Sequence, residues 1–117
     1  MSARRPLVIG IGQMLRNEDA VGRKVAEQFR STHPEEADVL GVIQLTPELA
    51  EAVSRSSAVA FVDARVDRPN ERILVETVSP TAGEPTAFSH VASAAEVLAY
   101  ARGVFGDAPP AVLVSIS

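Results

Sequence analysis

Short apolar runs without alternation, separated by segments of helical periodicity, constrain the fold of this chain more than any other feature. Short runs rich in Val, Ile, Leu and Ala are typical of strands buried on both faces, as in parallel sheets. They occupy residues 6–11, 38–45, 58–63 and 111–116. Because parallel strands need crossover connections, which are usually helices, the pattern predicts a three-layer α/β fold: a twisted, mostly parallel but mixed five-stranded sheet with helices on both faces.

Periodicity and capping signals place the helices between these strands. The first is predicted over residues 19–31, where Val21, Val25 and Phe29 recur on one face. The second begins at Thr46 as N-cap and Pro47 in the first turn. The third is predicted over residues 89–105, and its apolar face is formed by Val91, Ala94, Leu98, Ala101 and Phe105.

The remaining strand is predicted over residues 72–78, where apolar and polar side chains alternate. Alternation indicates a strand exposed on one face, and hence a place near the edge of the sheet. The predicted order is therefore β-α-β-α-β-β-α-β in a single domain, residues 1–117. The last buried strand, residues 111–116, is one covering helix short, so we expect either that the natural protein continues beyond it or that a partner covers that surface.

Composition excludes several classes of protein. A net charge of −4 without a basic block argues against nucleic acid as a partner. The chain has no cysteine, which removes thiol nucleophiles and thiolate metal sites and is consistent with a reducing compartment such as the cytoplasm. No apolar run approaches the roughly 20 residues of a membrane span, and the start of the chain lacks a signal-peptide core, so no membrane partner is expected.

Polar side chains gather where the predicted parallel strands end. Ligands of open α/β sheets bind beyond the carboxyl ends of the strands, so these side chains are the candidates for a functional site. In chain order they are Gln13, Asn17, Glu18, Asp19, Gln44, Thr46, Asp63 and, at the start of the late helix, His90.

This set of polar residues fits three common kinds of site poorly: a dinucleotide site, a phosphoacceptor site and a Ser-His-Asp hydrolase site. Gly10 and Gly12 match the first two glycines of GxGxxG, but Leu15 occupies the third position. Asp19 and its acidic neighbour would also compete with a phosphate for the helix N-terminus. A phosphoacceptor receiver domain needs a lysine after the last strand, whereas the single lysine is Lys24. A Ser-His-Asp hydrolase needs a GxSxG-like elbow, and the sequence contains none.

A divalent metal site is the remaining chemistry. The two carboxylates Asp19 and Asp63 and the imidazole of His90 suit a divalent transition ion and would leave coordination positions open for a substrate. Each residue also has a structural interpretation. Asp19 matches the charge of a helix N-terminus, Asp63 suits a turn after a strand, and His90 suits an exposed first helical turn.

Three segments of the sequence resemble the hydrogenase maturation proteases, the endopeptidases that trim the C-terminus of the large subunit of nickel–iron hydrogenases. GIGQMLRNEDAVGRKVAEQF resembles the opening glycine loop, acidic pair and first helix of the family. QLTPELAE followed by AVAFVDAR resembles the second helix and third strand, and FSHVASAAEVLAYA resembles the histidine-led late helix. The resemblance extends over nearly all of the chain.

The resemblance implies a mixed sheet between helices and a metal-binding set formed by Asp19, Asp63 and His90, with Asp19 and Asp63 as catalytic residues. It implies that the partner is a hydrogenase large-subunit precursor. Nickel would be supplied by that precursor rather than held permanently, and other divalent ions could substitute for it. The implied reaction is removal of the C-terminal extension after nickel insertion, with water as the attacking group.

Some positions depart from the family. Gln13 replaces a usual asparagine and Ala20 a common glycine, and family members usually continue beyond the last strand into a loop and helix. Two alternatives therefore stay open beside the endopeptidase. One is a non-catalytic metal-binding or scaffold domain of the same fold, and the other is a protease homologue that acts on a different precursor.

Overall fold

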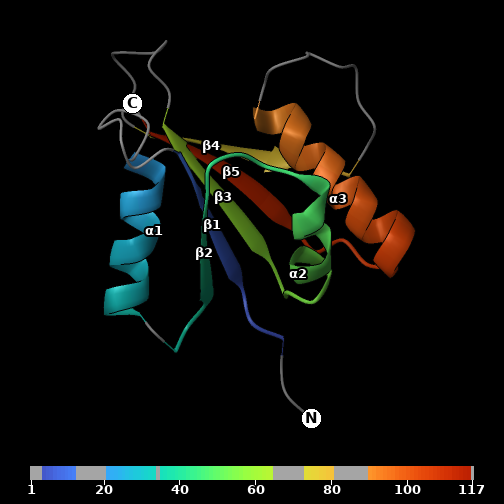
Figure 1. Cartoon of the computed structure of the whole chain (residues 1–117), viewed down its shortest axis with the longest axis horizontal. Helices are drawn as coiled ribbons and strands as arrows, with labels where there is room; N and C mark the ends of the chain where they lie inside the picture. The colour runs from blue at the N-terminus through green and yellow to red at the C-terminus, as the bar shows by residue number, and fades with distance from the viewer. Residues whose placement is uncertain (1–3, 13–20, 34, 65–72, 81–89, 117) are drawn as a thin grey trace.

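A mixed sheet forms the middle layer of the computed structural model (Figure 1), which describes residues 4–12, 21–33, 35–64, 73–80 and 90–116. Its five strands lie in the order β2-β1-β3-β5-β4, and β4 is antiparallel to its neighbour β5. The other pairings are parallel. The strands are β1 (Leu7–Ile11), β2 (Asp38–Val42), β3 (Val59–Ala64), β4 (Ile73–Val78) and β5 (Ala111–Ile116). The predicted α/β class and mixed sheet are confirmed.

Helices lie on both sides of this sheet. Helix α1 packs on one side, whereas α2 and α3 pack against each other on the opposite side (Figure 1). The bounds are α1 (Val21–Thr32), a 3-10 turn η1 (Pro47–Leu49), α2 (Ala50–Ser54) and α3 (His90–Phe105). We call the side covered by α2 and α3 the closed face and the opposite side the α1 face.

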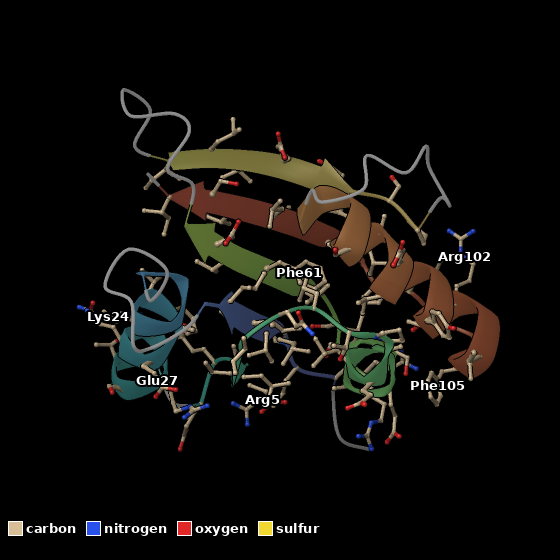
Figure 2. All side chains as sticks on the ribbon, turned by 45° about the horizontal axis from the view of Figure 1, so that its top comes forward. Arg5, Lys24, Glu27, Phe61, Arg102 and Phe105 are labelled. Carbon is tan, nitrogen blue, oxygen red and sulfur yellow. The ribbon has the colours of Figure 1, made fainter. Side chains whose placement is uncertain are left out.

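The hydrophobic core lies on the closed face. Alternate residues of β1, β3 and β5 point there, and small side chains of the helices let the layers approach closely. Phe61, at the centre of β3, is fully buried (Figure 2). The core is completed by Leu7, Ile9, Ile11, Ala50, Val53, Val59, Val78, Ala94, Val97, Leu98, Ala101, Ala111 and Leu113.

Two of the predicted helix faces need correction. Among residues 24–32 of α1 the fully buried side chain is Ala26, whereas Val25 is exposed and Phe29 is half-buried. In α3 the predicted Phe105 is exposed and points away from the sheet (Figure 2), while Val97 is buried. In α1 a small side chain occupies the line of closest approach to the sheet, and hydrophobicity alone does not reveal which residue does so. In α3 the misplaced Phe105 is the last residue of the helix.

The ends of the helices follow the capping chemistry only in part. Thr46 occupies the predicted N-cap with an extended backbone, but its side chain makes no capping hydrogen bond, and its carbonyl accepts one from Leu49 N–H at 3.1 Å. The first turn is consequently 3-10 and α-helix begins only at Ala50. Gly106 follows α3 with φ of +85°, the left-handed conformation that glycine adopts readily at a helix end.

The edge strand β4 carries apolar side chains on both of its faces. Ile73 and Val75 are 66% and 58% exposed, whereas Glu76 is half-buried on the closed face together with the buried Val78. The predicted edge position is confirmed, since β4 pairs only with β5 among the described strands. The other edge strand, β2, is shorter than predicted and ends at Val42.

Candidate functional site

Asp63 lies at the carboxyl end of β3, one of the three inner strands of the sheet. Its Cα is paired in register with that of Ser115 on β5. Because side chains alternate along a strand, Asp63 shares the closed face with Phe61, two residues earlier. Its side chain belongs to a residue only 7% exposed, so this carboxylate is buried beside the core as the sequence suggested.

The chain leaves β1 beside this carboxylate. Gly10 is paired with Val62, so the end of β1 lies next to Asp63. Gly12 then donates its N–H to the carbonyl of Val42 at 2.9 Å and adopts φ of +148°, a conformation that side chains with a Cβ rarely adopt. The exit of the chain from β1 therefore requires glycine at this point. Asp19 belongs to the segment that follows and lies outside the described residues.

His90 is the first residue of α3, in agreement with the predicted helix start. Helix α3 packs on the closed face and runs antiparallel to β5, so its first turn is the end that points toward the carboxyl ends of the strands (Figure 1). The backbone thus places His90 on the same face of the sheet as Asp63. The position of its side chain lies outside the description.

The proposed convergence of Asp19, Asp63 and His90 remains a prediction. Of the three, only the Asp63 side chain is among those described. Within the described part of the chain, no group of three or more His, Cys, Asp or Glu side chains is placed to hold a metal ion. A complete metal shell would therefore need Asp19, His90 or both in addition to Asp63.

Two polar residues on the strands that follow β3 across the sheet, β5 and β4, were missed by the sequence analysis. Ser115, the neighbour of Asp63 in register, is 3% exposed, and its Oγ makes no hydrogen bond within the described structure. Glu76 on β4 has a buried Oε2 that likewise makes none. The available signal was a serine inside the apolar run AVLVSI. For Glu76 the alternation of β4 gave no sign of which side would face inward.

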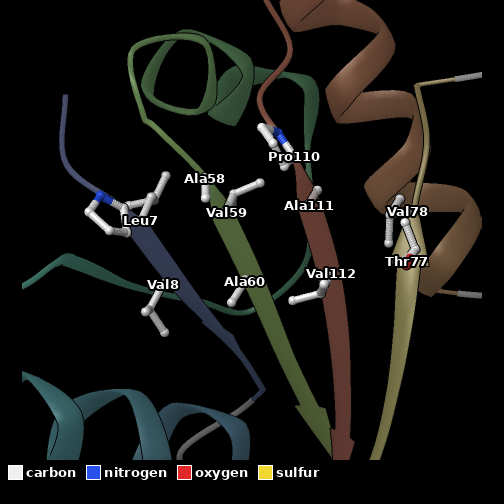
Figure 3. A pocket seen from close by; sticks show the side chains of 11 residues that line it. Leu7, Val8, Ala58, Val59, Ala60, Thr77, Val78, Pro110, Ala111 and Val112 are labelled. Carbon is white, nitrogen blue, oxygen red and sulfur yellow. The ribbon is translucent and has the colours of Figure 1, made fainter.

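An apolar hollow of about 430 Å³ lies at the opposite, amino-terminal end of the strands (Figure 3). Aliphatic side chains such as Val8, Ala60 and Val112 surround it, and Thr77 supplies the single polar side chain in its lining. It contains neither a titratable group nor any of the predicted site residues. The polar chemistry of the described residues inside the sheet is therefore concentrated at the carboxyl end, away from this hollow.

Comparison with known proteins finds similar folds among solved structures. No protein-family model matches the sequence, and no curated protein matches it either. The solved structure of the hydrogenase maturating endopeptidase HybD from E. coli superposes with a TM-score of 0.69 at 23% identity, covering 96% of this chain and 73% of that one.

Archaeal structures give the same result. The NiFe hydrogenase maturation protease HycI from Thermococcus kodakarensis KOD1 has a TM-score of 0.65 at 23% identity, covering 97% of this chain and 74% of its own. A hydrogenase 2 maturation peptidase from Thaumarchaeota archaeon SCGC_AB-539-E09 has a TM-score of 0.62 at 19% identity, with coverages of 97% and 78%.

The chain therefore has the α/β fold of the hydrogenase maturation endopeptidases, and it spans about three-quarters of their length. None of the described helices is both long and apolar enough to cross a membrane.

Proposed function

We propose that this chain is an endopeptidase that removes the C-terminal extension of a nickel–iron hydrogenase large-subunit precursor after nickel insertion. Two findings support the proposal: the fold shared with solved maturation endopeptidases, and the position of Asp63. The second is the observation that carries it. A carboxylate 93% buried at the end of an inner strand lies where open α/β sheets bind their ligands.

The nickel of the precursor is the part of the substrate that the site would recognise. Asp19, Asp63 and His90 would bind it through carboxylate oxygen and imidazole nitrogen, a donor set that suits a borderline divalent ion. Binding the metal would hold the precursor with its scissile bond near the two acids. Hydrolysis would then be effectively intramolecular, and its rate would depend on how well the reacting groups are oriented.

Hydrolysis would then use water as the nucleophile. The chain has no cysteine and no serine on a nucleophile elbow, so a covalent acyl intermediate has no evident residue to form on. Asp63 or Asp19 would act as general base toward that water, while the bound nickel would polarise the scissile carbonyl.

The test is cleavage of purified, nickel-loaded precursor, followed by mass spectrometry of the large subunit. Asp63→Asn keeps the size of the side chain but removes its charge, and we expect cleavage to slow by at least about 100-fold, the usual contribution of a general base. Asp38→Asn is the matched control, because Asp38 is an exposed acid at the amino-terminal end of β2. It should cleave at the rate of the unmodified protein.

Two results would contradict the proposal. One is cleavage by Asp63→Asn at the unmodified rate. The other is nickel binding by the unmodified protein without cleavage of any hydrogenase precursor, which would favour the non-catalytic metal-binding domain. A crystal soaked with cadmium checks the geometry separately. Ligand atoms of Asp19, Asp63 and His90 must then lie within roughly 4 Å of one another around the ion.

A further inference from the structure

The closed face contains an unexpected pair of polar atoms at its carboxyl end. Within the described structure, the buried side-chain atoms that lack a hydrogen-bond partner are Ser115 Oγ and Glu76 Oε2. Ser115 is 97% buried, so solvent does not compensate its hydroxyl. Such atoms are rare in native proteins, and each one calls for a bound water or a functional role as its explanation.

Register places Ser115 directly beside Asp63 and places Glu76 one strand further along the sheet. Ser115 is the direct neighbour of Asp63 across the β3–β5 pair. Glu76 is paired with Leu113, two residues before Ser115, so Glu76 and Ser115 are diagonal neighbours across the β5–β4 pair. Diagonal neighbours on one face have Cα atoms about 7–8 Å apart, a separation that a long side chain spans. Leu74 is the direct partner of Ser115 on β4, so Asp63, Ser115 and Glu76 form a stepped polar cluster, which we call the Asp63 row.

All three members of the Asp63 row point to the closed face. Each lies two residues from a buried core residue of its own strand, namely Phe61, Leu113 and Val78. An apolar residue at position 115 would continue the pattern of Leu113 and would leave no polar atom unpaired. The core packing therefore gives no reason for a serine there, and the adjacent Asp63 does.

We propose that Ser115 and Glu76 hold one bound water against the Asp63 carboxylate and act as positioning residues for it. The Ser115 hydroxyl donates to the water oxygen, and the water donates one hydrogen to Glu76 Oε2 and the other to a carboxylate oxygen of Asp63. Three hydrogen bonds are typical of a buried water. The inference deepens the proposed function, because it rests on Asp63 being a ligand of the substrate's nickel.

The consequence is a carboxylate with a fixed orientation. A metal-binding carboxylate loses affinity when the groups that orient it are removed, typically by 10–100-fold. Ser115 and Glu76 touch neither the nickel nor the scissile bond in this arrangement. Their effect would therefore appear as metal affinity rather than as stability of the fold.

The experiment measures the affinity of the full chain for nickel ion alone by titration calorimetry. Ser115→Ala should bind nickel at least about 10-fold more weakly, and Ser115→Thr, which restores a hydroxyl, should recover most of that loss. Ser56→Ala is the matched control. Ser56 is another buried serine, but its Oγ donates to the carbonyl of Ala52 at 2.8 Å, far from Asp63 in the fold. It should keep full affinity and lose only stability against urea.

Nickel affinity in Ser115→Ala equal to that of the unmodified protein would overturn the proposal. A crystal structure of the metal-free protein separates this failure from failure of the proposed function. An ordered water within hydrogen-bond distance of Ser115 Oγ and Glu76 Oε2 is expected there, and its absence overturns the inference even if the precursor is cleaved. Conversely, a water at this point in a protein that cleaves no precursor supports the Asp63 row and contradicts the protease.

Discussion

The two faces of the sheet are built from similar strands but are covered very differently. On the closed face the strand residues are buried under α2 and α3. On the α1 face the helix contacts β1, β2 and β3, while Val112 and Val114 of β5 are only half-buried and Ile73 and Val75 of β4 are exposed. One face is thus a close-packed core, and the other is covered over part of its width.

Because the closed face is covered more completely, polar residues buried there need an explanation that polar residues on the α1 face would not need. A carboxylate or hydroxyl on the α1 face of β4 or β5 would remain partly hydrated and would need no explanation. Asp63 and Ser115 are instead on the closed face, where a buried hydroxyl that lacks a partner, as Ser115 Oγ does within the described structure, costs roughly 1–3 kcal/mol in protein mutational data. That they are retained there is the reason to interpret this end of the face as a site.

The largest effect should come from a truncation at the centre of the closed face. Phe61 is fully buried, and Phe61→Ala should lower the free energy of unfolding by about 3–5 kcal/mol through lost transfer energy and a residual cavity. Urea denaturation measures this loss. Val75→Thr on the α1 face is the comparison, and its exposed position predicts a change below about 0.5 kcal/mol. Equal losses would mean that the two faces do not differ as described.

A smaller effect tests how α3, which helps to cover the closed face, ends. Gly106 adopts φ of +85° with open space around its Cα, so Gly106→Ala should destabilise by about 1 kcal/mol through backbone strain alone. Gly103, also in open space, lies within the helix, and Gly103→Ala should stabilise by about 0.5–1 kcal/mol. Shifts of opposite sign in the melting temperatures of the two variants would confirm the difference. A gain in stability from Gly106→Ala would contradict the left-handed conformation at the helix end.

The smallest effect concerns the solvent side of α2. Arg55 Nη2 lies 3.0 Å from Glu51 Oε1, an exposed pair four residues apart. A double-mutant cycle with Arg55→Ala and Glu51→Ala should give a coupling of about 0.3–0.5 kcal/mol, as for other helical surface pairs. The coupling should vanish in 1 M salt, where the Debye length is about 3 Å. A coupling that survives such salt would show that the pair is less hydrated than its exposure indicates.

The sequence predicted the order of the helices and strands better than it predicted which face of each helix packs against the sheet. Runs rich in apolar residues indicated the buried strands, and Pro47 and Gly106 indicated a helix start and a helix end. The orientation of α1 was missed because Ala26, rather than the larger Val25, lies against the sheet. Rotation of a helix depends on which side chains fit a particular sheet surface, and a periodicity of 3.6 residues does not contain that information.

The candidate site was predicted for Asp63 and missed for its neighbours. An acid that ends an apolar strand indicates a buried carboxylate from sequence alone, and Asp63 is one. Ser115 and Glu76 became visible only through strand order, because β4 and β5 are joined to β3 by pairings between distant segments. Which residues of separate strands become neighbours is a property of the register, and local sequence does not specify it.

The position of β5 also bears on how the chain reaches its fold. β5 is the last of the described strands in sequence, yet it lies between β3 and β4. During synthesis β4 consequently has no strand partner until residues 111–116 have left the ribosome, and the closed face lacks one of its central strands until then. Sheets that depend on such distant pairings fold slowly and expose apolar strands meanwhile. We therefore expect β4 to lack its strand partner while residues 79–110 are being synthesised, and exposed β4 to be the segment most in need of a chaperone.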